Sequence, residues 1–320
     1  MCNPYTRRAM SFPILTGGAP ELRPMAADDA AAVGAIIYRA IARAFRDHGQ
    51  PEPIAGEAEG ERLARLYLEI DPGGAVVAVR DGRIAAAGFL HLRDEVASLG
   101  PVAVDPDFQA QGIGKLLVER LTDRAARSAS TRVFVDAFNL RAFGIALKRG
   151  YVPRDLGIRL VALGRLAGPG MLLAIEPAPV RELVEGDLPA VALYDGAYFG
   201  GSRERDFRAL VAAGGIGLVA EEAGAVTGFV FGRIEGSLAT IGPGGADSAD
   251  LLGKLLARLG ERLAPGANIF LAYLMASQDE VVRQALAMGF RAASLSVYMV
   301  RGATTPLRRP SVIGLPPDVV

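Results

Sequence analysis

Residues 104–117 read VDPDFQAQGIGKLL, the end of an apolar strand, a proline turn, and two glycines that lead into an apolar helix. We expect a strand over 97–104 and a helix over 112–127. A helix N-terminus leaves backbone N–H groups without intrahelical partners, and glycine lets an anion approach them closely. The stretch therefore predicts a turn that binds a phosphate or pyrophosphate.

Three interpretations of this turn compete on the residues alone. The P-loop pattern fails, because no glycine stands five residues before Gly114 and Leu116 occupies its Ser/Thr position. The dinucleotide fingerprint finds Gly112, Gly114 and an acid, Asp136, at the end of the next strand, but Leu117 replaces its third glycine. A glycine turn that merely begins a helix is the third.

The chain also repeats itself. AAAGFLHLR at 85–93 resembles AVTGFVFGR at 225–233, and GKLL at 114–117 recurs at 253–256. Four anchors keep their order at offsets of 139 to 142 residues: Gly88 and Gly228, Pro101 and Pro243, Lys115 and Lys254, Tyr151 and Phe290. A repeat of this length predicts two copies of one domain fold.

Each copy has the same expected order of elements. In the first we expect strand 21–25, helices 28–46 and 60–69, a hairpin turning at Asp81-Gly82, strand 97–104, helix 112–127, strand 131–137, helix 140–149 and strands within 151–163. In the second we expect helices 186–196 and 203–213, a hairpin around 222–224, helix 247–262, strand 268–273 and helix 278–288. The fold class is α/β, with an α+β mixed sheet in two tandem domains.

The predicted domain boundaries follow composition. Residues 1–20 form a flexible N-terminus, 21–165 the first domain, 166–179 a glycine-rich linker, and 180–300 the second domain. The proline-rich residues 301–320 are expected to lie over the surface as a tail.

Composition limits the function. A chain of 320 residues suits two domains, and 35 Lys+Arg against 35 Asp+Glu gives no basic field for nucleic acid. No apolar run is long enough for a leader or a membrane span, so we expect no membrane partner and a cytoplasmic location. The one cysteine, Cys2, and two histidines predict no metal site.

The glycine turn resembles the GCN5-related N-acetyltransferase family, whose members carry Q/R-x-x-G-x-G/A between a strand and a helix. Here the motif is complete as QAQGIG at 109–114. The flanking VAVDP at 102–106, Gly88, Asn139, Ala142 and Gly150-Tyr151 also fall where that family's pattern places them. The resemblance covers roughly 21–165.

The resemblance implies an acetyl-CoA-dependent N-acetyltransferase that acts on a primary amine of a small molecule or peptide, as a monomer or a homodimer. It further implies that the loop amides bind the pyrophosphate of the cofactor. The pantetheine arm is then expected to bind along the strand before the loop. The implied cofactor-binding residues are Val102, Ala103, Val104, Gln109, Ala110, Gln111, Gly112, Ile113, Gly114, Lys115 and Asn139.

The catalytic residues are less clear in the pattern. His91 lies on a strand expected to face the acceptor cleft, and its ordinary pKa suits removal of an ammonium proton; a hydrogen-bonded structural histidine is the alternative. The family usually places a tyrosine seven residues after the asparagine, and here that position is Ala146. Tyr151, Tyr38 or a water can replace it, although Tyr151 also matches the family's core aromatic position. A non-catalytic acyl-CoA-binding regulatory protein is therefore the alternative function.

The second copy lacks the glycine motif. The stretch from Pro243 to Gly253 is three residues shorter than that from Pro101 to Gly114, and Gln278 falls at the Asn139 position. We expect the second domain to keep the fold without the cofactor site and to form a wall of the acceptor cleft.

Overall fold

The computed structural model describes residues 18–50, 52–54, 56–164, 166, 180–303 and 309–314. Its first half follows the expected order of elements. These are β1 (Glu21–Pro24), η1 (Ala27–Asp29), α1 (Ala30–Asp47), α2 (Glu57–Ile70), β2 (Val76–Arg80), β3 (Arg83–Arg93), β4 (Val96–Val104), η2 (Pro106–Phe108), α3 (Ile113–Arg124), η3 (Ala125–Arg127), β5 (Ser130–Asp136), α4 (Leu140–Lys148) and β6 (Val152–Leu163).

The second half repeats this order. Its elements are β7 (Val180–Glu182), η4 (Glu185–Asp187), α5 (Leu188–Phe199), α6 (Glu204–Ala212), β8 (Ile216–Glu222), β9 (Ala225–Glu235), β10 (Leu238–Ala246), α7 (Ala249–Leu263), β11 (Ile269–Met275), α8 (Asp279–Ala287), β12 (Arg291–Gly302) and β13 (Ser311–Val312).

Both hairpins turn where the sequence predicts. Asp81 and Gly82 join β2 to β3, and Ala223 and Gly224 join β8 to β9. All four residues have positive φ angles, between 51° and 81°, as the mirror-image two-residue turn requires.

The described strands form one sheet of 13 strands in the order β1-β2-β3-β4-β5-β12-β6-β11-β10-β9-β8-β7, with β13 paired to β10. The two halves exchange their last strands. β12 of the second half pairs along β5 from Ser296 opposite Asp136 to Gly302 opposite Ser130. β6 of the first half pairs in the same way with β11. Each half is thus completed by a strand from the other.

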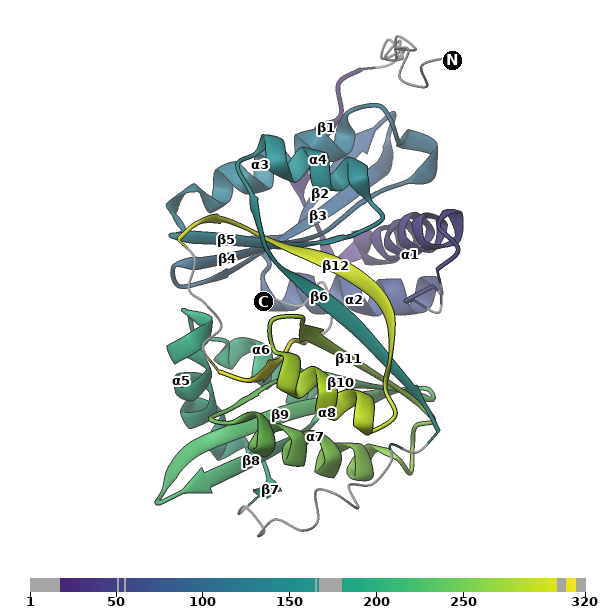
Figure 1. Cartoon of the computed structure of the whole chain (residues 1–320). Helices are drawn as coiled ribbons and strands as arrows, with labels where there is room; N and C mark the ends of the chain where they lie inside the picture. Colours follow the sequence, from purple (N-terminus) through teal and green to yellow (C-terminus); the bar gives the residue numbers. More distant parts are fainter. Residues whose placement is uncertain are drawn as a thin grey trace, which may run out of the picture.

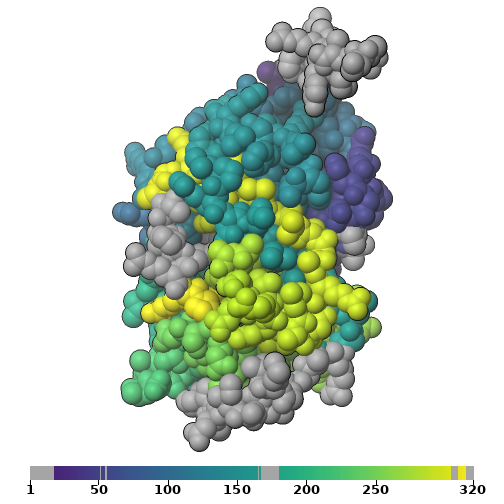
Figure 2. Space-filling model, viewed as in Figure 1, coloured from purple at the N-terminus to yellow at the C-terminus, as the bar shows by residue number. Residues whose placement is uncertain are grey.

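The exchange is visible at the middle of the molecule. Figure 1 shows β6 and β12 crossing together between the two halves, and Figure 2 shows the corresponding teal and yellow surfaces interleaved there. β6 and β12 pair with each other over nearly their whole length. The predicted boundary between 165 and 180 therefore separates the halves in sequence, while the sheet runs through both.

Side chains alternate between two covered faces of the sheet. Val77, Ala87 and Phe89 pack under α1 and α2, whereas Ala86 and Leu90 pack under α3. The second half repeats the arrangement, with Phe229 and Phe231 under α5 and α6 and Val230 under α7. This period of two fixes which residues of each strand face which helices.

The prediction of a surface tail is wrong for residues 309–314. Ser311, Val312 and Ile313 are each no more than 6% exposed, and Ser311 and Val312 form β13 inside the sheet. A two-residue strand beside prolines gives too short a pattern to recognise from sequence. The rest of the predicted tail after Ala303, the N-terminus before Gly18 and most of the 166–179 linker lie outside the described residues.

Candidate functional site

A split opens in the sheet beside the glycine turn. In the described part of the chain, β4 and β5 pair only from Val96 to Ser98 opposite Ser130 to Arg132. Beyond those pairs β4 diverges at a bulge, where Gly100 has a φ of +142° and the register with β3 shifts. We call this gap, between 99–104 of β4 and 133–136 of β5, the first split.

The loop after β4 is held by its own side chains. Asp105 is 3% exposed; its carboxylate accepts from the Asp107 amide at 3.0 Å and pairs with Arg39 at 2.6 Å. Gln109 donates to the Val104 carbonyl at 3.1 Å. Gln111 donates to the Asp107 carbonyl at 3.2 Å. The two glutamines of the motif therefore fold the loop, together with the amides of Asp107, Phe108 and Gln109, which are bonded within it.

The start of α3 has the features of an anion site. Gly112 precedes the helix with a φ of +84° and makes no side-chain cap, and the first intrahelical bond runs from the Leu116 amide to the Gly112 carbonyl at 3.0 Å. The N–H groups of Ile113, Gly114 and Lys115 thus project from the positive end of the helix. A Cβ at Gly112 would meet nothing within 4 Å, so there is free space beside this residue at the start of the helix.

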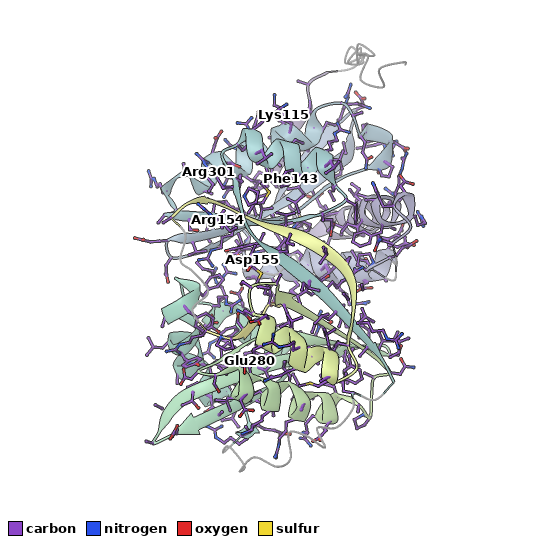
Figure 3. All side chains as sticks on the ribbon, in the orientation of Figure 1. Lys115, Phe143, Arg154, Asp155, Glu280 and Arg301 are labelled. Atoms are coloured by element: carbon purple, nitrogen blue, oxygen red, sulfur yellow. The ribbon has the colours of Figure 1, made fainter. Side chains whose placement is uncertain are left out.

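The equivalent helix start in the second half is closed. Ser248 precedes α7, and its hydroxyl accepts from the Leu251 amide at 3.1 Å. Asp250 adds negative charge to the first turn, which disfavours an anion. Figure 3 labels Lys115 at the start of α3 in the first half; Glu280, labelled in the second half, lies at the start of α8. The two halves have thus diverged at the point where a phosphate would bind.

Asn139 lies across the first split from the loop. It precedes α4, and its side-chain oxygen accepts from the Ala142 amide at 3.1 Å. This capping role was not apparent from the resemblance, which gave the residue to the cofactor. The cap fixes the orientation of the Asn139 amide group at the end of β5.

His91 lies in a buried ionic network rather than at an open cleft. It is 1% exposed, and its Nδ1 lies 2.7 Å from Oδ2 of Asp71. Arg93 donates to the same carboxylate at 3.0 Å and to Asp206 of α6 at 2.6 Å. Burial raises the pKa of Asp71, but the hydrogen bonds from His91 and Arg93 outweigh it and leave that pKa below its ordinary value. This environment favours the structural alternative for His91.

Tyr151 and Ala146 lie together in the core under α4. Both are at most 6% exposed and pack with Val135 and Met299. Burial raises the pKa of Tyr151, which makes it a poorer proton donor at neutral pH. The structure therefore places Tyr151 as a core aromatic.

A polar cluster that sequence reasoning missed lies at the end of the first split. Asp136 ends β5, and the Ser296 hydroxyl of β12 donates to its carboxylate at 3.3 Å. Arg159 of β6 faces the same carboxylate and lies over the Phe45 ring at 5.0 Å. Burial raises the pKa of Asp136, and Arg159 and Ser296 only partly offset that rise. In the sequence, only the position of Asp136 at the end of a strand pointed to this cluster. Its partners lie on β12 and β6 and are brought to it by the strand exchange.

Comparison with known proteins identifies the class of fold. A candidate acetyltransferase from Pyrococcus horikoshii superposes with a TM-score of 0.75 at 20% identity, over 95% of this chain and 96% of that one. A tandem GNAT protein from the clavulanic acid biosynthesis pathway gives a TM-score of 0.55 at 16% identity, over 89% and 99%. These likenesses show the fold alone, and they confirm the expected mixed-sheet, two-part architecture.

The family follows from the sequence of the first half. Residues 36–151 match the Acetyltransferase (GNAT) family, so the chain carries a GNAT-family domain there, as the glycine motif predicted. The [ribosomal protein bS18]-alanine N-acetyltransferase of Escherichia coli strain K12 is 32% identical over 104 residues, which is 32% of this chain. The chain spans about 64% of the length of that relative.

Two further findings concern the described residues only. None of their helices is both long enough and apolar enough to cross a membrane. Nor do these residues bring together three or more His, Cys, Asp or Glu side chains in a way that could hold a metal ion.

Proposed function

We propose that the first half binds acetyl-CoA and transfers the acetyl group to a primary amine of a small molecule or peptide. The observation that carries this proposal is the uncapped start of α3 at the mouth of the first split. Amides at 113–115 and the loop before them suit a diphosphate. The free edge of β4 at Val102, Ala103 and Val104 suits an arm that contains amide groups, because such an arm can pair with the strand backbone.

The residues of this chain have three tasks in such a transfer. Acetyl-CoA would supply a thioester, whose C–S bond breaks as the amine nitrogen bonds to the acyl carbon. Backbone N–H groups on the β4 edge can stabilise negative charge on the acyl oxygen. The acceptor must lose a proton, and the thiolate must gain one. Solvent can supply the proton that the thiolate gains. Because the reference pKa of a thiol is about 8.5, the thiolate can leave without a dedicated acid.

Asp136 is our candidate for the group that takes the ammonium proton. It stands at the open end of β5, and its raised pKa makes it a better proton acceptor than an ordinary carboxylate. His91, the sequence-based candidate, is 1% exposed and bonded to Asp71, so it would act only through other groups. Tyr151 is likewise enclosed, at 2% exposure.

A peptide amino terminus is the acceptor class that the relatives support. The curated relative acts, by its name, on an alanine of a ribosomal protein, and its similarity covers the domain that holds the first split. The alternative function, a regulatory protein that binds acyl-CoA without turnover, is favoured by one observation. At the position where the family usually has a tyrosine, this chain has Ala146, which packs in the core and has no proton to donate.

Two measurements on the full chain test the proposal. Calorimetric titration with acetyl-CoA should show saturable binding at one site per chain, because the equivalent helix start in the second half, that of α7, is capped by Ser248. Thiol release with acetyl-CoA and a panel of amines and alanine-initiated peptides should then depend on the acceptor. Binding without acceptor-dependent release would favour the regulatory alternative, and absence of binding would refute both.

A further inference from the structure

The second half has a split of its own, and the chain's last described segment fills it. β10 and β11 pair from Leu238 to Ile241 opposite Ile269 to Ala272 and then diverge. We call the gap beyond these pairs the second split. Segment 309–314 runs into it and bonds to both walls: the Ala246 amide donates to the Pro310 carbonyl at 3.0 Å, and the Ile313 amide donates to the Tyr273 carbonyl at 2.9 Å.

Gln278 holds this segment from the side. Its amide nitrogen donates to the Ser311 hydroxyl at 2.9 Å and to the Arg309 carbonyl at 3.2 Å, and its oxygen accepts from the Ser311 amide at 2.9 Å. Gln278 occupies the place in the repeat that Asn139 has in the first half. Asn139 therefore borders the open split of the first half, whereas Gln278, at the equivalent position, binds a peptide segment in the second half.

Charge and ring contacts fix the front of the segment. The Arg309 guanidinium lies 3.2 Å from the Asp247 carboxylate and 4.5 Å from the centre of the Tyr194 ring. Tyr194 in turn donates to Asp247 at 2.9 Å. These contacts with Asp247 and Tyr194 suit a cationic side chain just before β13.

The apolar residues of the segment complete two cores. Val312 is 1% exposed and packs in the cluster under α7 and α8, while Ile313 is 6% exposed and packs on the opposite face near Phe134 of β5. Neighbouring residues that enter opposite faces are the signature of a true strand. The segment is thus built into the protein as a structural ligand.

The walls of the second split are shaped for this occupant. A Cβ on Gly242 would clash with the Ile313 carbonyl, and Gly244 and Gly245 form the stretch of β10 that pairs with Val312 and Ser311. The corresponding stretch of the first half carries Val102 and Ala103 instead. Gly242 in particular leaves room for the backbone at Ile313 to lie close against β10.

We propose that the second split is a peptide-binding site whose occupant is the chain's own segment 309–314, and that this occupant closes the second half to acyl-CoA. The segment joins β10 to β11 in the second half. This place corresponds to the first split, where the proposed function has acetyl-CoA bind in the first half. Peptide binding here does not depend on that proposed function; only the closure to acyl-CoA refers to it.

Hydrogen exchange of the full chain is the first test. The Ser311 and Ile313 amides should be protected to the degree of the β10 amides. Gln278→Ala should speed exchange at Ser311 by about tenfold or more, because the amide loses its buried acceptor. Asp279→Ala is the matched control, since Asp279 lies next to Gln278 but bonds only to the exposed Arg283 at 2.7 Å. Unprotected Ser311 and Ile313 amides in the unaltered chain would overturn the proposal.

Rescue in trans is the second test. A chain that ends at Ala303 should melt at a lower temperature and should bind a labelled peptide RPSVIG, which restores the melting temperature. The same peptide carrying V312D should do neither. If the shortened chain does not fold alone, it should be recovered by refolding with RPSVIG and not with the V312D peptide; equal behaviour of the two peptides would refute the site.

Stoichiometry separates this proposal from the proposed function. One acetyl-CoA per full chain agrees with both. Two per chain would overturn the closure of the second half. No acetyl-CoA binding together with specific capture of RPSVIG would remove the proposed function and leave the peptide site standing.

Discussion

Arg93 and Asp206 join the two halves through a bidentate contact. The Arg93 guanidinium, on β3, donates to both carboxylate oxygens of Asp206, on α6, and one of these bonds measures 2.6 Å. Arg93 also reaches Asp71 after α2. Both Arg93 and Asp206 are under 8% exposed, so the charges depend on one another for compensation.

The first prediction concerns this pair. Arg93→Met should lower the free energy of unfolding by about 3–5 kcal/mol, because it removes the buried cation that bonds to both Asp206 and Asp71. Urea unfolding of the full chain measures the change. Arg208→Met is the matched control, on α6 beside Asp206: Arg208 is exposed and pairs with Glu204 and Glu185, so its loss should cost at most about 1 kcal/mol. Equal effects of the two substitutions would show that the network carries no special stability.

A second prediction uses two carboxyls with opposite shifts. Burial raises the pKa of Asp136, so its charged form costs stability as the pH rises from the ordinary value of 3.8 through the folded value. Asp136→Asn should therefore raise the free energy of unfolding at pH 7, with no gain well below pH 3.8. The opposite holds for Asp71, whose lowered pKa gives stability above pH 3.8 that is lost as the pH falls through the folded value.

Asp71→Asn should accordingly destabilise the protein at pH 7 and converge with the unaltered chain in acid. Unfolding curves from pH 7 to pH 3 check both variants. Parallel stability profiles for the unaltered chain and Asp136→Asn would contradict the assigned shift. If Asp136→Asn increases stability but reduces acetyl transfer, then Asp136 contributes to function while it lowers the stability of the folded protein.

Much of each half could be predicted from local pattern. The Asp81-Gly82 turn and the helical spacing in α1 required only neighbours in sequence, whereas the repeat required a comparison of stretches 139 to 142 residues apart. The strand, glycine turn and helix formed by β4 and α3 were also predictable, since they are contiguous within about 30 residues.

The exchange of β6 and β12 could not be predicted, because it pairs each strand with a partner from the other half of the chain, far away in sequence. The contact of Asp136 with Ser296 joins residues 160 positions apart and exists only through that exchange. The burial of His91 could not be predicted for a related reason. Its cover comes from Asp71 and a network extending to α6 of the other half, and no local pattern reports such cover.

A third prediction concerns the missing tyrosine. The sequence alone suggests that Ala146→Tyr would restore a proton donor and raise turnover. The structure predicts instead a loss of about 1–3 kcal/mol in the free energy of unfolding, since Ala146 is enclosed by Val135, Tyr151 and Met299. Gly144→Ala on the same helix is the control. It adds a Cβ into space free of atoms within 4 Å and should stabilise by about 0.5–1 kcal/mol. A stable, faster Ala146→Tyr enzyme would contradict this packing argument.

The last prediction isolates the anion site from folding. Gly112 and Gly214 have φ angles of +84° and +82°, and a Cβ on either would meet nothing within 4 Å. Alanine at each position should cost a similar amount, about 1–2 kcal/mol, through the left-handed backbone alone. Only Gly112 precedes the open amides of α3, so Gly112→Ala should weaken acetyl-CoA binding by about tenfold or more, while Gly214→Ala leaves it unchanged. Calorimetric titration of both variants measures the difference. Equal affinities would mean that the diphosphate does not approach the start of α3, because the added methyl group would then stand in space that the ligand never uses.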